Sequence, residues 1–178
     1  MKVCVFCSAN GQISPDFFRA AEELGRWAAL QGHSLVYGGV NQGLMERMAQ
    51  AAKQAGGRTI GVIPTIVEKA GRRSDCVDVE LWCDNLSDRK QLMMDQADVF
   101  VALPGGIGTL DEVFTVVASA TIGYHDKRLV LYDVGGFWKP LVNLLDHLQQ
   151  QGMVRGEWSR FISVVDNIEG LEAVMREL

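Results

Sequence analysis

The segment from Val99 to Leu103 restricts the fold of this chain more than any other feature. All of its residues are apolar, and it leads directly into Pro104-Gly105-Gly106. A strand that is apolar on both faces is typical of a parallel sheet covered by helices on both sides, whereas a half-solvated strand would alternate with polar residues. A helical pattern follows over Thr109–Gly123. The sequence therefore predicts a buried strand, a glycine turn and a helix in direct succession.

Strand-like and helix-like segments alternate along the rest of the chain. Strands are predicted over Lys2–Cys7, Ser34–Tyr37, Arg58–Ile63, Cys76–Cys83, Asp98–Leu103, Arg128–Tyr132 and Phe161–Val165. Helices are predicted over Pro15–Gln31, Gln42–Ala55, Leu86–Gln96, Thr109–Gly123, Phe137–Gln151 and Ile168–Leu178. The polar, basic segment Thr65–Asp75 has no clear period and is predicted to be a loop.

This order of segments predicts an α/β fold, a Rossmann-like three-layer domain with a mostly parallel sheet and helices on both faces. The chain has 178 residues and shows no repeat or linker, so a single domain over residues 1–178 is expected. Ligands of such sheets bind at the carboxyl ends of the strands. The glycine turns after Tyr37 and Leu103 would lie at that edge.

The net charge and the length of the apolar segments limit the classes of partner that are expected. The net charge of −5 does not suggest a nucleic-acid-binding surface. No signal peptide is recognisable, and no stretch approaches the roughly 20 apolar residues of a membrane helix, so a cytoplasmic protein without membrane contact is expected. Cys4 and Cys7 would point to opposite faces of a strand, and the histidines are scattered. We therefore expect reduced cysteines and no metal site.

The loop after Leu103 has the properties of a phosphate-binding turn. Gly105, Gly106 and Gly108 allow the backbone to approach a ligand closely, and Thr109 adds a hydroxyl group. The free amides at a helix start favour an anion. The loop matches neither the dinucleotide G-x-G-x-x-G pattern nor a P-loop, so hydride transfer and ATP hydrolysis are not indicated and no cofactor is expected. From spacing alone, a glycine-rich turn without a ligand is the alternative.

Glu112 has two interpretations. Thr109-Leu110-Asp111-Glu112 fits a capping box, in which a glutamate at the third helical position bonds back to the capping residue. The other interpretation is a catalytic carboxylate. The two are compatible only if the carboxylate is exposed to a pocket.

Two further segments are candidates for the same pocket. Tyr37-Gly38-Gly39 leads into a helix, and its glycines would line the pocket from a neighbouring strand, or would simply allow the helix to pack on the sheet. Arg89 and Lys90 lie near the start of the helix over Leu86–Gln96, where cations oppose the helix dipole. An anion nearby would compensate for that placement, and a solvated charged turn is the alternative.

Together these segments resemble the LOG family of cytokinin riboside 5′-monophosphate phosphoribohydrolases, often mislabelled as lysine decarboxylases. The family pattern P-G-G-x-G-T-x-x-E is intact from Pro104 to Glu112. Its Y-G-G-G-x-x-G-L-M and R-K-x-x-M patterns are matched at Tyr37, Gly38, Gly39, Gly43, Leu44, Met45, Arg89, Lys90 and Met93. The order of elements matches over nearly the whole chain.

The chain departs from the family pattern at four places, which bear on base or sugar specificity more than on the reaction. Val40 replaces a third glycine, and Glu46 stands where a glycine is common. Leu86-Ser87 replaces Met-His, and the first loop reads Cys7-Ser8-Ala9-Asn10 without the usual Gly-Ser-Ser.

The resemblance implies hydrolysis of the N-glycosidic bond of a nucleoside 5′-monophosphate, AMP or an N6-modified AMP of the cytokinin type, to free base and ribose 5-phosphate. It implies Glu112 and Arg89 as catalytic residues. It implies substrate binding by Gly105, Gly106, Gly108, Thr109, Gly38, Gly39, Lys90, Met93 and Ser8. No Schiff-base lysine with an acidic partner for a pyridoxal ring is recognisable, so decarboxylation is not expected.

Two functions other than hydrolysis are compatible with this fold. A carrier of the same fold would bind a nucleotide or a molybdopterin-like ligand without turnover, but it needs neither Glu112 nor Arg89. A nucleotide-sensing interaction domain would carry an extra docking segment, which this chain does not show.

A homodimer is also expected. Beyond its two carboxylates, the helix over Thr109–Gly123 is apolar around most of its circumference. One face would therefore meet the sheet and the other a second copy of the chain.

Overall fold

The computed structural model describes residues 1–178, and its elements follow the predicted order. The strands are β1 (Lys2–Phe6), β2 (Ser34–Tyr37), β3 (Arg58–Pro64), β4 (Val79–Cys83), β5 (Val99–Ala102), β6 (Leu129–Tyr132) and β7 (Ile162–Val165). The helices are α1 (Pro15–Leu30), α2 (Gly43–Gln54), α3 (Thr65–Lys69), α4 (Leu86–Gln96), α5 (Ile107–Thr121), α6 (Lys139–Gln150) and α7 (Ile168–Met175). Short 3₁₀ turns, η1 (Val134–Gly136) and η2 (Trp158–Arg160), flank α6.

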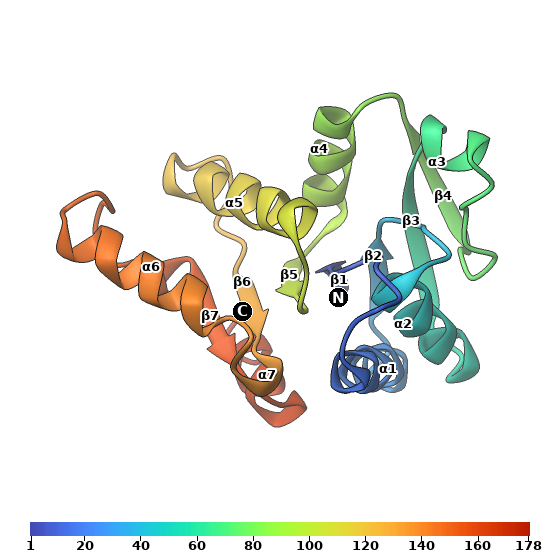
Figure 1. Ribbon diagram of the computed structural model, residues 1–178, viewed down its shortest axis with the longest axis horizontal. Helices are drawn as coiled ribbons and strands as arrows, with labels where there is room; N and C mark the ends of the chain where they lie inside the picture. Colours follow the sequence, from blue (N-terminus) through green and yellow to red (C-terminus); the bar gives the residue numbers. More distant parts are fainter.

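All seven strands form one parallel sheet in the order β4-β3-β2-β1-β5-β6-β7. Helices α1, α2 and α7 pack on one face, and α4, α5 and α6 pack on the other (Figure 1). The predicted Rossmann-like, three-layer α/β fold is therefore confirmed. The direction of winding reverses between β1 and β5, and open parallel sheets bind ligands at such a reversal.

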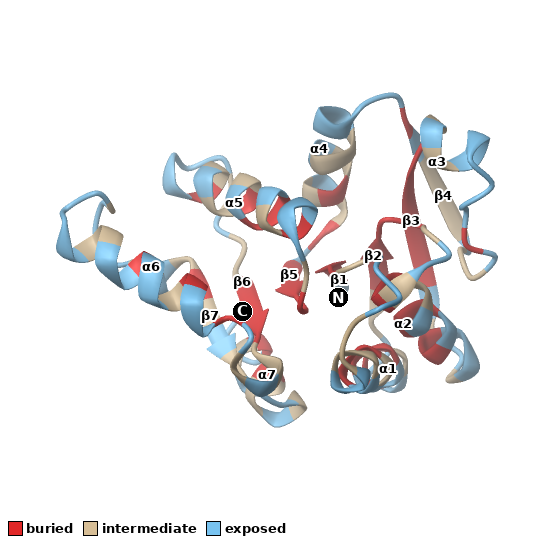
Figure 2. Cartoon of the chain, in the orientation of Figure 1, coloured by how far each residue is buried: buried red, intermediate tan, exposed pale blue.

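Side chains alternate between two hydrophobic cores, one on each side of the sheet. In β5, Val99 and Val101 belong to the core under α1 and α2, whereas Phe100 and Ala102 belong to the core under α4, α5 and α6. All four residues are buried (Figure 2). The unbroken apolar run from Val99 to Leu103 is thus explained by a strand that has helices over both faces.

The segment Thr65–Asp75 differs from its prediction. It begins with the helical turn α3 (Thr65–Lys69), which is capped by Ala70 and followed by Gly71 with a φ of +66°. A helix of five residues is too short to display a helical period, so the sequence pattern did not reveal it. The predicted strand Cys76–Cys83 is likewise shorter, because β4 begins at Val79.

The cysteines at the start of the chain lie on opposite sides of the sheet, as their spacing predicts. Cys4 and Cys7 lie in opposite cores, and all four cysteines are free. No group of three or more His, Cys, Asp or Glu side chains is arranged to hold a metal ion. No helix combines the length and apolarity required to cross a membrane.

The loops at the reversal point are tied together by backbone hydrogen bonds. The Ser8 amide, after β1, donates to the Pro104 carbonyl, after β5, at 3.2 Å. The Ser8 carbonyl in turn accepts from the Leu44 amide at the start of α2 at 2.9 Å. Three chain segments that are distant in sequence therefore form one rigid rim at the carboxyl edge of the sheet.

Candidate active site

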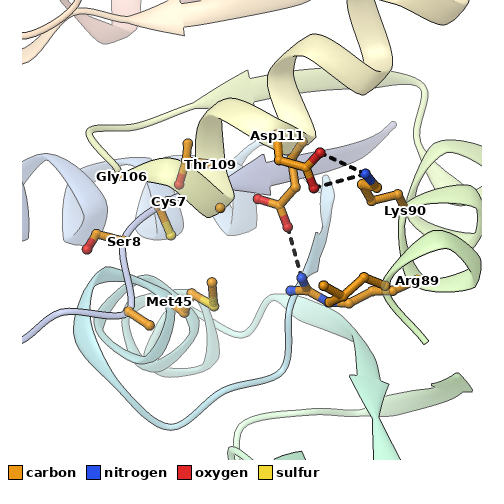
Figure 3. Close-up of a pocket in the computed structure, with 12 residues that line it drawn as sticks. Cys7, Ser8, Met45, Arg89, Lys90, Gly106, Thr109 and Asp111 are labelled. Atoms are coloured by element: carbon orange, nitrogen blue, oxygen red, sulfur yellow. Dashed lines mark hydrogen bonds and ion pairs between the residues drawn. The ribbon is translucent and has the colours of Figure 1, made fainter. Parts of the chain in front are cut away.

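A cavity of about 340 Å³ opens at this rim between the loops after β1 and β5 (Figure 3). Predicted site residues line much of it, namely Ser8, Arg89, Lys90, Gly106, Gly108, Thr109 and Glu112. Further lining residues are Cys7, Ala9, Met45, Leu86 and Asp111. Residues from the loop after β1 and from α2, α4 and α5 thus converge on one cavity.

The first turn of α5 supplies backbone donors to this region. Gly106 precedes the helix and no side chain caps it, and the Leu110 amide makes the first intrahelical bond, to the Gly106 carbonyl at 3.0 Å. The amides of the first three helical residues therefore have no intrahelical acceptor. A phosphate at this point would accept those amides and would be favoured by the helix dipole.

Gly105 does not line the cavity but permits its geometry. A Cβ atom at this position would lie 2.1 Å from Thr109 Oγ1. The absence of a side chain at Gly105 therefore allows the Thr109 hydroxyl to fold back against the turn. The four-residue spacing between Gly105 and Thr109 therefore requires glycine at position 105, because any side chain there would collide with Thr109.

Glu112 and Arg89 form a buried ion pair across the cavity. Arg89 Nη1 donates to Glu112 Oε1 at 3.0 Å, and the two side chains are 13% and 7% exposed. Burial raises the pKa of the Glu112 carboxyl, and the Arg89 guanidinium opposes that rise. Arg89 Nε is buried and has no hydrogen-bond partner in the protein. The pair thus presents a carboxyl of elevated pKa beside a guanidinium with a free donor.

The helix boundary excludes the capping interpretation of Glu112. Helix α5 begins at Ile107 rather than Thr109, so Thr109 is inside the helix and Glu112 is more than a turn from its start. From that position the carboxylate bonds Arg89 of α4 instead of the helix end. The Gly106 cap has no side chain that would have marked this start in the sequence.

A second ion pair joins the same two helices beside the first. Lys90 Nζ lies 2.9 Å from both carboxylate oxygens of Asp111, and the dashed lines in Figure 3 mark these contacts. The Asp111 side chain is 53% exposed, so this pair borders the cavity on its solvent side.

The glycines after β2 lie behind the cavity wall rather than in it. A Cβ on Gly38 would lie 2.2 Å from Arg89 Nη2, so the guanidinium rests directly against this residue. Gly39 has a φ of +67°, which favours glycine. Met93 is buried in the core below α4 and does not reach the cavity.

Five lining residues were not predicted as site residues, and two of them, Leu86 and Cys7, differ in how far the sequence pointed to them. Leu86 is the first residue of α4, and its position beside Arg89 was the only sequence signal available. Cys7 lies at the cavity floor, where burial raises the pKa of its thiol and the nearby Glu112 charge raises it further. Cys7 is therefore a neutral wall residue rather than a nucleophile.

Comparisons with known proteins identify the family of this chain. A family model described as "possible lysine decarboxylase" matches residues 45–175. A cytokinin riboside 5′-monophosphate phosphoribohydrolase from Rhodococcoides fascians is 34% identical over 177 residues, covering 98% of this chain and 88% of that protein. A probable enzyme of the same name from rice, LOGL2, is 37% identical over 86% of this chain, which spans 63% of the rice protein's length.

Solved structures share the fold over nearly the whole chain. A molybdenum cofactor carrier protein from Chlamydomonas reinhardtii superposes with a TM-score of 0.76 at 25% sequence identity, covering 99% of this chain and 96% of that one. This carrier and the phosphoribohydrolases have different functions, so the shared fold alone does not determine the activity.

Proposed function

The chain belongs to the family that the "possible lysine decarboxylase" model describes, the LOG family, and we propose that it hydrolyses the N-glycosidic bond of a nucleoside 5′-monophosphate. The observation that carries this proposal is the buried Arg89–Glu112 pair, which faces the same cavity as the uncapped start of α5. A carboxylate and an anion-binding helix start are the two parts that such a reaction needs.

The 5′-phosphate of the substrate is assigned to the start of α5. The free amides there and the Thr109 hydroxyl donate to its oxygens, and Lys90 adds a positive charge at the cavity border. The Ser8 hydroxyl accepts from the Asn10 amide at 3.0 Å, which leaves its proton available to a ligand. Binding energy from the phosphate orients the ribose before the bond breaks.

Glu112 is assigned to the reacting carbon. Cleavage of a glycosidic bond passes through an oxocarbenium-like transition state, which a carboxylate stabilises while it accepts a proton from the attacking water. Water supplies the new oxygen at the ribose carbon, the base leaves with the bonding electrons and is protonated, and the products are free base and ribose 5-phosphate. The elevated pKa of Glu112 makes it a stronger base than an exposed glutamate.

Arg89 keeps this carboxylate in place and ionised. Its guanidinium favours the charged form of Glu112, and its unpartnered Nε supplies a donor for the substrate. Because the guanidinium lies against Gly38, it has little freedom to turn away.

The substrate class is proposed to be AMP or an N6-modified AMP of the cytokinin type. If the phosphate supplies much of the binding, AMP is cleaved roughly 100-fold or more better than adenosine in kcat/KM. Chromatographic detection of free base from a panel of nucleotides and nucleosides tests this. Equal rates for AMP and adenosine would show that the α5 start does not bind the phosphate.

The carrier alternative is supported by the similarity to the Chlamydomonas protein. A carrier binds its ligand and releases it unchanged, so it would bind AMP without producing adenine. The same assay therefore distinguishes the two functions, because adenine release is expected only from the hydrolase.

We also propose that the protein is a homodimer through α5. The outward side of this helix and the turn after it leave large apolar side chains exposed, namely Ile107, Phe114, Ile122 and Tyr124. Exposed apolar patches of this kind mark interfaces. Light scattering at micromolar concentration should give twice the chain mass, and Phe114→Asp should give a monomer. A monomeric parent protein would contradict the proposal.

A further inference from the structure

The guanidinium of Arg89 carries one donor for which the protein supplies no acceptor. Its Nη1 donates to Glu112 Oε1 at 3.0 Å (Figure 3), whereas its Nε is buried and has no hydrogen-bond partner. Asp111 is the only other carboxylate that lines the cavity, and both of its oxygens lie 2.9 Å from Lys90 Nζ. Buried donors without a partner are uncommon, and one on a residue that lines a cavity indicates a ligand.

The acceptor that fits this donor is a neutral oxygen atom. Glu112 already balances the charge of Arg89, and its side chain is only 7% exposed, so a second anion here would lie beside a buried carboxylate. A hydroxyl group carries no charge, and it can accept the N–H bond of Arg89 while it donates its own proton to Glu112. A hydroxyl of the substrate therefore matches both members of the ion pair.

The role of Glu112 in the proposed reaction selects one ribose hydroxyl, and the inference rests on that reaction. Glu112 is assigned to C1′, the carbon from which the base leaves. The ring oxygen bonded to C1′ becomes positive in the transition state, so it is a poor acceptor for a guanidinium. The 2′-hydroxyl is on the next ring carbon, and the 3′-hydroxyl is one bond further away. Hydrogen bonds to the hydroxyl next to the reacting carbon strengthen as a glycosidic bond breaks.

We propose that Arg89 Nε and Glu112 together bind the ribose 2′-hydroxyl, and that this contact selects ribonucleotides over 2′-deoxyribonucleotides. With a deoxyribonucleotide the Arg89 donor stays buried and unpaired. Sites that bind a substrate hydroxyl strongly reject analogues without it for this reason. The intrinsic chemistry has the opposite preference, because an electron-withdrawing hydroxyl at C2′ makes an oxocarbenium ion harder to form. Faster cleavage of the ribonucleotide would therefore reflect recognition by the protein.

The ratio of kcat/KM for AMP to kcat/KM for 2′-deoxy-AMP tests the contact. The parent should favour AMP about 100-fold or more, whereas 3′-deoxy-AMP, the matched control substrate, should be cleaved within about tenfold of AMP. Arg89→Lys keeps a cation beside Glu112 but has no Nε donor, so its preference for AMP should fall below about tenfold, whatever its overall activity. Lys90→Gln, at the next position of α4, should slow both nucleotides alike and keep the parental ratio.

Binding of the sugar product separates this test from the test of hydrolysis. Calorimetric titration with ribose 5-phosphate and with 2-deoxyribose 5-phosphate needs no turnover. Ribose 5-phosphate should bind about tenfold more tightly to the parent, and Arg89→Lys should remove the difference. If AMP is not hydrolysed but the difference in binding is found, the hydrolysis proposal fails and the hydroxyl contact stands.

Three results would overturn the contact and leave hydrolysis of AMP in place. The first is 2′-deoxy-AMP that is cleaved as efficiently as AMP by the parent protein. The second is a parental ratio in Arg89→Lys, which would assign the selection to another residue. The third is equal binding of the two sugar phosphates.

Discussion

Helices α4 and α5 are joined by two ion pairs that differ by one residue at each end. Arg89 pairs with Glu112, and Lys90 pairs with Asp111, both at about the same length. Successive residues of an α-helix are turned by about 100°, so one pair faces the cavity interior and the other faces solvent. The same two helices therefore hold one ion pair that is buried and one whose carboxylate is exposed to solvent.

This difference in burial determines what each pair can do. In the buried pair, desolvation raises the pKa of Glu112 and leaves Arg89 Nε without a partner. In the other pair the Asp111 side chain is 53% exposed, and ion pairs open to water contribute about 0–1 kcal/mol to stability. Two adjacent basic residues on α4 and two adjacent acidic residues on α5 thus form one reactive pair and one pair at the cavity border.

The largest effect is expected from Glu112→Gln. Gln keeps the hydrogen bond to Arg89 but can neither stabilise an oxocarbenium ion nor accept a proton from water. AMP hydrolysis should fall about 100-fold or more, while the unfolding free energy changes by less than about 2 kcal/mol. Adenine release and thermal unfolding measure the two effects. Parental hydrolysis by this variant would remove Glu112 from the mechanism.

Arg89→Ala should produce a smaller loss together with a change in pH dependence. Burial places the pKa of Glu112 above its ordinary value, and Arg89 is the main influence that lowers it. Without Arg89 that pKa rises further, and the ionised carboxylate is lost at a higher pH. The acid limb of kcat/KM should therefore move to higher pH, with a fall of about tenfold or more at neutral pH. An unmoved acid limb would show that another group titrates.

Gly38→Ala tests the support behind the buried pair. The new methyl group would lie 2.2 Å from Arg89 Nη2, so the guanidinium must shift and its contact with Glu112 weakens. Hydrolysis should fall about tenfold, because small displacements of a positioned group are costly. Gly11→Ala is the control, since its methyl group would meet no atom within 4 Å. An equal effect of both changes would indicate a general loss of folding.

Much of the fold and part of the site were predictable from the sequence, for different reasons. The alternation of apolar strands with helices follows from local chemistry, and it predicted the topology class. The pattern from Pro104 to Glu112 predicted the cavity, because its glycines let the backbone come close to a ligand. Gly105 also leaves room for the Thr109 side chain.

The remaining features depend on contacts between distant segments. Glu112 bonds Arg89 and does not cap α5, because α4 packs beside α5. The local sequence around Glu112 carries no information about this packing. Met93 matches a family motif, yet its side chain is buried in the core because the α4 helix turns it away from the cavity. Cys7 enters the cavity floor only because β1 ends beside the α5 turn.

Asp111→Asn is expected to have the smallest effect, and for that reason it tests the comparison most directly. It removes one negative charge at the position next to Glu112, on the same helix, and leaves the length of the side chain unchanged. Because the Asp111 side chain is 53% exposed, water replaces most of what Lys90 loses. Stability should change by less than about 1 kcal/mol, and AMP hydrolysis should change by less than about threefold, within the range of a screened surface charge. Loss of Asp111 also removes a contribution that raises the pKa of Glu112, so the acid limb should move slightly to lower pH, opposite to the effect of Arg89→Ala. A loss of activity comparable to that of Glu112→Gln would mean that burial does not separate the two pairs, and that both carboxylates take part in the reaction.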